Sequence, residues 1–486
     1  MRKSRPRQLL LPFAESPQGD GREGRPDESG CDARTVHTGK GSQRSELTPP
    51  PVAARLLEQV AATENLKQAL HKVYRNKGAP GVDRVTVEEV WRNRSSLLPK
   101  LRDALLEETY VPGDIRRVWI PKSNGEQRGL GIPNVIDRWA SQAVLQVLEP
   151  LYDPTFHESS HGFRPRRGAQ TALAQAAEYL KQGYRWVVDL DLEKFFDQVC
   201  HQRLLDRLGQ RIGDRRLLRM IRLLLKAKVV LPDGTRVVTT MGTPQGGPLS
   251  PLLSNIVLDE LDQEFERRGL RFVRYADDGR VFVKSPRAGK RIMASITRFI
   301  ESRLRLKVNQ EKSAVDLAQK RHFLGFHIGT SRSGELKVTL SARSFDRIKA
   351  RIREFTPRNW GRSLAACMEA IAAYIRGWIG YFRLCTKRVV RTLRYLDSHI
   401  RRRLRAVIIC QKKTARHLFR HLHEHGASRR TAASTAFGCH GTWQKSRSSG
   451  VHQAYPNSWF NERFVMLEPA WRARRFDWRS LWETSF

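Results

Sequence analysis

The stretch of sequence that decides the fold spans residues 272 to 283 and reads Phe272-Val273-Arg274-Tyr275-Ala276-Asp277-Asp278-Gly279-Arg280-Val281-Phe282-Val283. Two apolar segments flank an acidic centre, and the Asp-Gly pair is a strong signal for a tight turn. The pattern therefore predicts a β-hairpin whose carboxylates lie at or beside its tip. An ordinary solvated turn would explain Asp-Gly alone, but two acids within so apolar a hairpin favour a functional site.

A second acidic pair lies on a predicted strand, Trp186-Val187-Val188-Asp189-Leu190-Asp191. Because side chains alternate along a strand, Asp189 and Asp191 would share one face. An acid bounded by Trp, Val and Leu is costly to bury, so it needs a partner, a proton or a metal ion. This strand is therefore a candidate to complete a site with the hairpin.

Three carboxylates brought together would repel one another, by about 4 kcal/mol per pair at 4 Å and an effective dielectric near 20. Divalent cations relieve this repulsion, and Mg²⁺ suits carboxylates combined with substrate phosphates. Two such ions, about 3.5–4 Å apart, can serve an attacking and a leaving oxygen. The carboxylates thus predict phosphoryl transfer with two Mg²⁺ ions as cofactors.

The charge of the chain points to a polyanionic partner. Its 486 residues carry 88 Lys and Arg against 49 Asp and Glu, a net charge of +39. Such an excess repels itself unless a polyanion neutralises it, although a merely basic soluble protein is the alternative. Residues 341–486 are the densest part, with 30 basic and 9 acidic side chains. The sequence has no apolar run of about 18 residues and no CxxC pair, so we expect no membrane span and a reducing cytoplasm.

The chain divides into three predicted parts. Residues 1–50 are rich in Gly, Pro, Ser and Arg, without apolar periodicity, and predict a disordered basic tail. Residues 51–340 alternate predicted helices and strands, and residues 341–486 have the spacing of long basic helices. The predicted fold class is therefore α+β followed by an all-helical part.

Further motifs accompany the hairpin in a fixed order, and they are Ile120-Pro121-Lys122, Arg128-Gly129-Leu130-Gly131-Ile132-Pro133, Ser160-His161-Gly162-Phe163-Arg164-Pro165, Asp191-Leu192-Glu193-Lys194-Phe195-Phe196-Asp197, Thr243-Pro244-Gln245-Gly246-Gly247-Pro248 and Phe323-Leu324-Gly325-Phe326. From about residue 56 to the C-terminus, this set resembles the reverse transcriptases and maturases encoded by bacterial group II introns. The resemblance implies a right-hand polymerase, with fingers and an antiparallel palm sheet over 51–340 and a helical thumb and maturase domain over 341–486.

By this resemblance, Asp191, Asp277 and Asp278 form the catalytic triad that binds the metal ions. Asp189 is the alternative for the first position. We prefer Asp191 because it opens the Asp-Leu-Glu-Lys-Phe-Phe-Asp stretch.

The resemblance also implies a nucleotide pocket. Lys122 and Arg128 would neutralise the triphosphate, although two exposed strand cations would read the same way. Phe196 matches the aromatic gate that excludes a 2′-hydroxyl, and core packing is its competing explanation. Gln245 stands before two glycines, where backbone can approach a nucleotide closely.

A basic helix near residue 400 is the candidate RNA contact. Its apolar residues follow helical spacing, and arginines mostly occupy the other faces, namely Arg391, Arg394, Arg401, Arg402, Arg403 and Arg405. A solvated basic helix is the alternative. The family's thumb and maturase domain grips intron RNA, so the resemblance implies that these arginines do the same.

The predicted function is RNA-directed DNA synthesis, combined with help in splicing and mobility of an intron. The partners would be intron RNA, a DNA primer or target and deoxynucleoside triphosphates, in a bacterial cytoplasm near the nucleoid. Two alternatives remain, a domesticated reverse transcriptase in host defence or repair and a maturase that only aids splicing. We expect no HNH endonuclease, because Cys439 stands alone near the end. The sequence leaves a monomer or a homodimer open.

Overall fold

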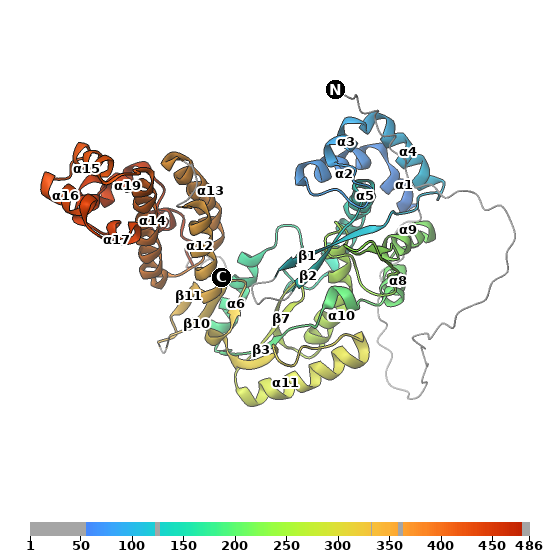
Figure 1. Cartoon of the computed structure of the whole chain (residues 1–486). Coiled ribbons are helices and arrows are strands. Elements are labelled where there is room, and N and C mark those ends of the chain that lie inside the picture. Colours follow the sequence, from blue (N-terminus) through green and yellow to red (C-terminus); the bar gives the residue numbers. More distant parts are fainter. Residues whose placement is uncertain (1–54, 122–126, 332, 358–362, 479–486) are drawn as a thin grey trace, which may run out of the picture.

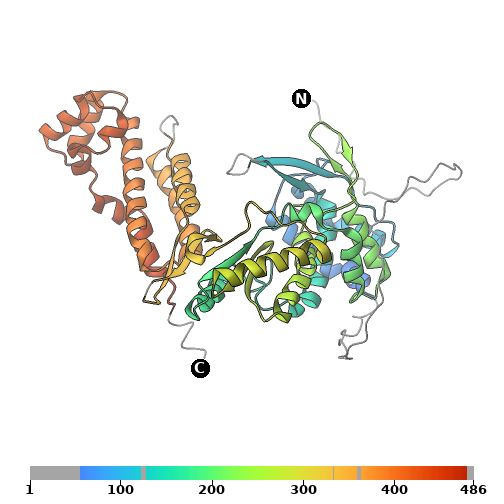
Figure 2. The same cartoon turned by 90° about the horizontal axis from the view of Figure 1, so that it is seen from below.

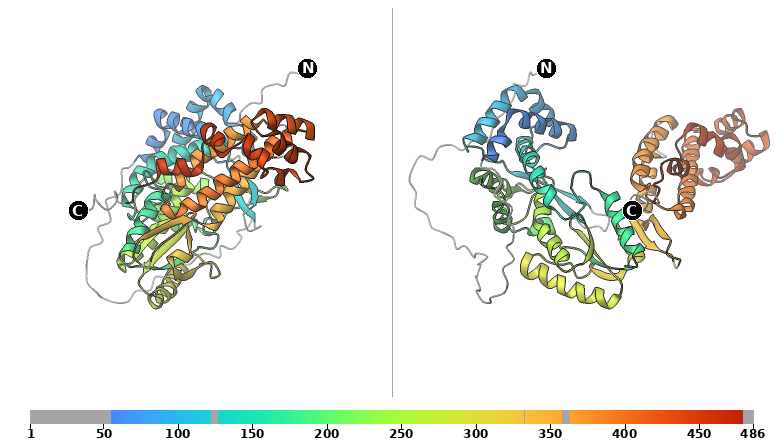
Figure 3. Two further views of the ribbon diagram at one scale, coloured as in Figure 1. Left: turned by 90° about the vertical axis from the view of Figure 1, so that its left-hand side faces the viewer. Right: turned by 180° about the vertical axis from the view of Figure 1, so that it is seen from behind.

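The computed structural model describes residues 55–121, 127–331, 333–357 and 363–478. The predicted tail over 1–50 and Lys122 lie outside these residues. Helices from the beginning of the chain stand on one side of a central sheet, and helices from its end stand on the other (Figures 1 and 3). The described chain is thus α+β in the arrangement of a right-hand polymerase.

The central sheet carries the acidic hairpin. Its four strands are antiparallel and lie in the order β6 (Arg271–Tyr275), β7 (Asp278–Val283), β3 (Trp186–Leu190) and β8 (Ala314–Leu317). In this register Leu190 lies opposite Gly279. Asp191, the residue that follows β3, therefore comes at the level of Asp278, which brings the two predicted acidic segments together.

Successive side chains of β3 point to opposite faces of the central sheet, and each face packs against a different hydrophobic core. Val188 and Leu190 pack into one core with α10 (Ser250–Arg267) and α11 (Pro286–Phe299). Val187 packs into the other core, with α6 (Ala169–Lys181) and the C-terminal helices. Figure 2 shows α11 running along one side of the sheet. Because both faces are covered, the sheet is a rigid base for its hairpin.

The N-terminal side combines helices with a second sheet. The sheet has the order β2-β1-β4-β5, with β1 (Ile115–Pro121), β2 (Gln127–Ile132), β4 (Val229–Val230) and β5 (Arg236–Val237). It contains two antiparallel pairs, β1 with β2 and β4 with β5. The surrounding helices are α1 (Leu56–Ala61), α2 (Thr63–Asn76), α3 (Val87–Arg92), α4 (Arg94–Leu106), α5 (Val135–Tyr152), α7 (Phe195–Gln198), α8 (His201–Gly209) and α9 (Arg215–Leu225).

The C-terminal side begins with a three-stranded sheet in the order β11-β10-β9, formed by β9 (His322–Phe323), β10 (Phe326–Thr330) and β11 (Leu336–Leu340). The described chain beyond it is helical: α12 (Ala342–Phe355), α13 (Leu364–Phe382), α14 (Val390–Gln411), α15 (Ala415–Glu424), α16 (Arg429–Phe437), α17 (Thr442–Lys445), α18 (Ser449–Ala454), α19 (Asn457–Arg463) and α20 (Leu467–Arg474). Short 3₁₀ or π turns occur at Asp153–Thr155, Ile300–Leu304, Ala318–Lys320 and Lys387–Val389. Among the described helices, none has the length and apolarity that crossing a bilayer requires.

Candidate active site

The acidic hairpin turns at Ala276 and Asp277, and Tyr275 pairs with Asp278 across the turn. The expectation of a hairpin is confirmed, but the Asp278-Gly279 pair is not the turn itself, because both residues already belong to β7. Ala276 has φ of 57°, in the left-handed region that residues other than glycine seldom occupy. Such a backbone persists only where the surroundings hold it.

Arg274 holds this turn from below. Its side chain is 1% exposed and forms an ion pair with Asp262 of α10, which is fully buried. The guanidinium also donates to the carbonyl oxygen of Ala276 at 3.0 Å and to Oδ1 of Asn255 at 2.9 Å. One signal of this role is present in the sequence, because a cation within an apolar strand needs a buried partner.

A loop residue packs directly under the same turn. A Cβ on Gly162 would lie 2.2 Å from the backbone nitrogen of Ala276, so only glycine fits there. The side chain of Asn255 donates to the carbonyl oxygen of Gly162 at 2.9 Å, and the backbone of His161 donates to the carbonyl oxygen of Arg274 at 2.8 Å. Gly162 and His161 thus support the hairpin, whereas Phe163 of the same motif is 48% exposed.

Two predicted acids, Asp191 and Asp277, line one open cavity of about 950 Å³. Asp278 follows Asp277 in the chain, and its side chain is exposed to solvent. Burial by the surrounding protein, followed by the charges of Asp277, Asp189 and Asp191, raises the pKa of Asp278 to about 6. Nζ of Lys312 lies 3.8 Å from Oδ2 of Asp191 and offsets one charge. Such a set of oxygen ligands fits divalent cations of the Mg²⁺ type.

Asp189, the alternative first acid, is held by two arginines. Arg280 contacts both of its carboxylate oxygens, at 3.1 and 3.2 Å. Arg321 donates from Nε to Oδ2 at 2.8 Å. These pairs offset the charge of Asp189, which still acts on Asp278.

The two adjacent phenylalanines of α7 both line the cavity that contains Asp191. Phe195 is 2% exposed and belongs to the core, and Phe196 is half-buried and packs against the same core. Their rings meet edge to face with centroids 5.3 Å apart. The cavity wall therefore includes the predicted gate residue, Phe196, but both rings combine lining with packing.

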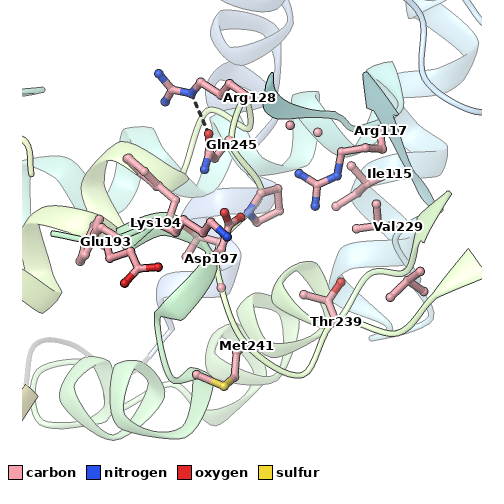
Figure 4. Close-up of a pocket in the computed structure, with 18 of the residues that line it drawn as sticks. Ile115, Arg117, Arg128, Glu193, Lys194, Asp197, Val229, Thr239, Met241 and Gln245 are labelled. Atoms are coloured by element: carbon pink, nitrogen blue, oxygen red, sulfur yellow. Dashed lines mark hydrogen bonds between the residues drawn. The ribbon is translucent and has the colours of Figure 1, made fainter. Parts of the chain in front are cut away.

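Arg128 and Gln245 also line this cavity and contact each other (Figure 4). Nε of Arg128 donates to Oε1 of Gln245 at 2.8 Å. The loop after Gln245 turns at Gly246, whose φ is 126° and where a Cβ would lie 2.6 Å from the carbonyl oxygen of Gly131. This glycine therefore allows close approach to β2, and the sequence argument had assigned that approach to a nucleotide.

Two cations of the cavity were missed by sequence reasoning. Arg117 of β1 lines it beside Val229, as Figure 4 shows, and Lys312 comes from the loop before β8. Alternation along β1 was the available signal for Arg117. No local pattern marks Lys312, because only the palm fold brings it to Asp191.

A second cavity, of about 450 Å³, lies on the other side of Asp278. It is lined by Leu324 and Gly325 of the motif at 323–326 and by aromatic side chains of α13. One of these, Tyr381, is 40% exposed and donates to the carbonyl oxygen of Leu324 at 2.9 Å. Arg347 of α12 adds positive charge.

The arginines of α14 do not form one exposed row. Arg391 and Arg394 are exposed, and Arg394 approaches Glu468 at 3.6 Å. Arg402 is half-buried, with its guanidinium 3.7 Å from the ring centroid of Trp443. Arg403, half-buried, donates from Nε to Oγ1 of Thr356 at 2.9 Å, and Arg401 is also half-buried.

Arg405 corrects the expectation that every member of the set faces RNA. It is 3% exposed and donates to the carbonyl oxygen of Tyr455 at 2.7 Å and to Oδ1 of Asn457 at 3.0 Å. A cation so buried must be satisfied by the protein, so Arg405 packs α14 against the end of α18. The apolar stripe of α14 is confirmed, since Leu393, Leu396, Ile400 and Leu404 are buried.

Comparison with known proteins is consistent with this geometry. Residues 120–328 match the family described as "Reverse transcriptase (RNA-dependent DNA polymerase)". Residues 345–426 match the family described as "Group II intron, maturase-specific domain". The first match contains every predicted acid, and the second contains α14.

Among related proteins, the chain is 32% identical over 357 residues to Protein YkfC of Escherichia coli (strain K12), covering 65% of this chain and 91% of YkfC. It is 28% identical over 366 residues to the Group II intron-encoded protein LtrA of Lactococcus lactis subsp. cremoris, covering 58% of this chain and 61% of LtrA. A solved structure titled "Partial Cas6-RT-Cas1--Cas2 complex" matches 51% of this chain and 43% of its own at 24% identity, with a TM-score of 0.34. The chain belongs to the family of bacterial group II intron-encoded reverse transcriptases and maturases.

Proposed function

We propose that the chain is an RNA-directed DNA polymerase that uses Asp191, Asp277 and Asp278 as its catalytic acids. One observation carries the proposal: Asp191 and Asp277 line a single cavity together with Phe196, Arg128 and Gln245. Asp278 lines the neighbouring cavity, and the charges of both other acids act on it. Carboxylates beside phosphate-binding cations are the parts that phosphoryl transfer needs.

Divalent cations would be held by these three carboxylates. The raised pKa of Asp278 supports this assignment, because the same crowding that favours its protonation favours a bound cation. Two Mg²⁺ ions, when bound, would neutralise phosphate charge and activate the primer's terminal hydroxyl. Nζ of Lys312 lies 3.8 Å from Oδ2 of Asp191, which is longer than a hydrogen bond. A bound cation would therefore replace Lys312 as the partner of this carboxylate.

The incoming deoxynucleotide would lie against the wall of the cavity. Arg128 would neutralise triphosphate oxygens, and Lys122 of the same hairpin would assist it. Gln245, fixed by its hydrogen bond to Arg128, would orient the nucleotide from the opposite side. The ring of Phe196 would exclude a 2′-hydroxyl by occupying its place.

The nucleic acid would pass from the palm to the C-terminal helices. The cavity beside Asp278 offers Arg347 and Tyr381 to a primer end. Exposed Arg391 and Arg394 of α14, together with half-buried Arg401, Arg402 and Arg403, are the remaining candidates for RNA contacts. The match to a maturase-specific domain supports a role in intron splicing as well as copying.

Primer extension on an RNA template tests the polymerase proposal. The purified full chain, with a DNA primer, deoxynucleoside triphosphates and Mg²⁺, should add nucleotides, and Asp277→Ala should abolish addition. Filter binding of the same RNA should be nearly unchanged in Asp277→Ala, since the acid does not attract phosphate. The proposal fails if the wild type adds no nucleotide, or if Asp277→Ala still extends the primer.

A splicing assay separates the two activities. If the C-terminal helices aid splicing on their own, Asp277→Ala should splice a self-splicing group II intron as well as wild type does. If Asp277→Ala lost splicing activity to the same extent as it loses nucleotide addition, a maturase surface separate from the polymerase site would be contradicted.

A further inference from the structure

Three potential metal ligands meet at the C-terminal turn of α15. They are His421, Glu424 and His425, and one ligand atom from each lies within 4.8 Å of the others. Residues separated by three and four positions share a helix face, which explains why the sequence brings them together. Figure 1 places α15 at the far end of the C-terminal helices, away from β7 and the polymerase site.

The hydrogen bonds of the two imidazoles prepare them for metal binding. Nδ1 of His425 lies 2.8 Å from the carbonyl oxygen of His421, and a carbonyl only accepts, so Nδ1 carries the proton. The lone pair of His425 is therefore on Nε2. Nε2 of His421 lies 2.7 Å from the hydroxyl oxygen of Tyr455, which can accept a hydrogen bond from Nε2–H and leave the lone pair on Nδ1. Such outer partners fix the tautomer of metal-binding histidines in proteins.

The two imidazole rings also lie close to each other. The ring centroids of His421 and His425 lie 4.1 Å apart, so two imidazolium ions at these positions would repel each other. A pair of neutral imidazoles beside a carboxylate attracts a cation, and Glu424 offsets part of the ion's charge.

We propose that His421, Glu424 and His425 bind one Zn²⁺ ion, with solvent in the fourth position. Zn²⁺ prefers imidazole nitrogen with carboxylate oxygen and accepts a tetrahedral arrangement, as two histidines one helical turn apart provide. Mg²⁺ prefers six oxygen ligands and would not compete. Residues of this cluster play no part in the proposed polymerase chemistry, so the two metal sites are independent.

The ion would reinforce the packing of the C-terminal helices. His421 contacts Tyr455, which follows α18, and Arg405 of α14 donates to the carbonyl oxygen of Tyr455. Fixing the ring of His421 would therefore stabilise the junction of α14, α15 and α18. Lys412 lies near enough to act on His421 by charge, so Lys412→Ala should strengthen Zn²⁺ binding.

The test uses the full chain without an affinity tag, stripped with a chelator. Zn²⁺ binding is measured by competition with a chromophoric chelator, and Co²⁺ absorption reports the coordination. We expect the wild type to bind one equivalent of Zn²⁺ at this site. The affinity should fall a hundredfold or more in His425→Ala, and it should fall less in Glu424→Gln. Millimolar Mg²⁺ should not displace the ion. Zn²⁺ should also raise the Tm of the wild type, but not that of His425→Ala.

His423→Ala is the matched control. His423 lies on α15 and is exposed like His425, but its ring pairs with Phe419 and with the carbonyl oxygen of Ala427 instead. Its affinity for Zn²⁺ should equal that of wild type. The proposal is overturned if the stripped chain binds no Zn²⁺, if His425→Ala binds as tightly as wild type, or if His423→Ala weakens binding as much as His425→Ala does.

Discussion

Two Asp-Gly pairs among the described residues occupy different positions in their hairpins. Asp233-Gly234 lies in the turn between β4 and β5, where Gly234 has φ of 90°. Asp278-Gly279 instead begins β7, and the turn comes just before it. The same dipeptide is thus a turn in one hairpin and a strand in the other. The packing beneath Ala276 decides the difference, because Asp-Gly alone carries the same local preference in both places.

The electrostatics of the two pairs differ as well. The backbone N–H of Thr235 donates to Asp233 at 2.9 Å and lowers the pKa of its exposed carboxyl. Burial and neighbouring acids raise the pKa of Asp278 to about 6. The carboxylate of Asp233 is stabilised by its own hydrogen bond, whereas the carboxylate of Asp278, beside other acids, is stabilised by a bound cation. This contrast separates a solvated turn from a candidate site.

The largest expected effect is on the rate of nucleotide addition, and it shows whether Asp189 or Asp191 forms the catalytic site with the acidic hairpin. Asp191→Asn should reduce nucleotide addition about ten-thousandfold, as removal of a group acting on the reacting atoms does. Asp189→Asn should reduce it far less, because Arg280 and Arg321 already occupy that carboxylate. Single-turnover primer extension, at a temperature where circular dichroism shows both variants folded, compares them. Equal losses in the two variants would make Asp189 a partner in the metal site.

The next effect concerns the support of the turn. Arg274→Met should lower the free energy of unfolding by about 3–5 kcal/mol, because Asp262 would remain buried without its partner. Arg271→Met, at the exposed start of the same strand, is the control and should change it little. Urea unfolding of both variants measures the difference. If Arg274→Met were as stable as Arg271→Met, the buried ion pair would not hold the hairpin.

A smaller effect has opposite signs in the two hairpins. In the folded protein Asp278 binds its proton more tightly than in the unfolded chain, so stability falls as pH rises from about 4 through about 6. With a chelator at pH 8, Asp278→Asn should gain about 1 kcal/mol, allowing for the side that faces solvent. Asp233→Asn should lose stability, because an ionised acceptor disappears.

Thermal unfolding at pH 8 and pH 4 measures both variants. The gain of Asp278→Asn should shrink at pH 4, where the wild-type carboxyl is largely protonated in the folded state. A gain that is the same at both pH values would point to packing rather than charge.

The smallest effect tests the backbone. Gly234→Ala should cost about 1 kcal/mol, because alanine is strained at a φ of 90°. Gly279→Ala should be nearly neutral for stability, since its Cβ would meet Leu190 at an ordinary 3.9 Å. Hydrogen exchange of the β4–β5 and β6–β7 amides reports each hairpin separately. A larger loss in Gly279→Ala would mean that the turn includes this residue after all.

Much of the palm could be predicted because its signals are local. Apolar segments around Asp277 and alternation up to Asp191 predict the two strands, and the structure pairs them as neighbours. Phe196 lines the cavity, but so does Phe195, so the resemblance alone distinguishes the two as gate candidates. These features depend on residues close together in the sequence.

The remaining features depend on contacts between distant segments. Lys312 reaches Asp191 only through the pairing of β3 with β8, and no motif marks it. Arg405 lies on α14 among arginines of the same spacing, yet the fold buries it against Tyr455. Helical periodicity therefore could not separate an RNA-facing arginine from a buried one. Lys122 lies outside the described residues, so its role stays a prediction.

The rate of single-nucleotide incorporation opposite an RNA template tests the central claim most directly, with Asp278→Asn measured beside Asp233→Asn. We predict that Asp278→Asn, although more stable without metal ions, loses about four orders of magnitude. Asp233→Asn should stay within about twofold of wild type, as expected of a surface substitution away from the site. If Asp278→Asn incorporated nucleotides within tenfold of the wild-type rate, the acidic hairpin would not be the centre of the active site.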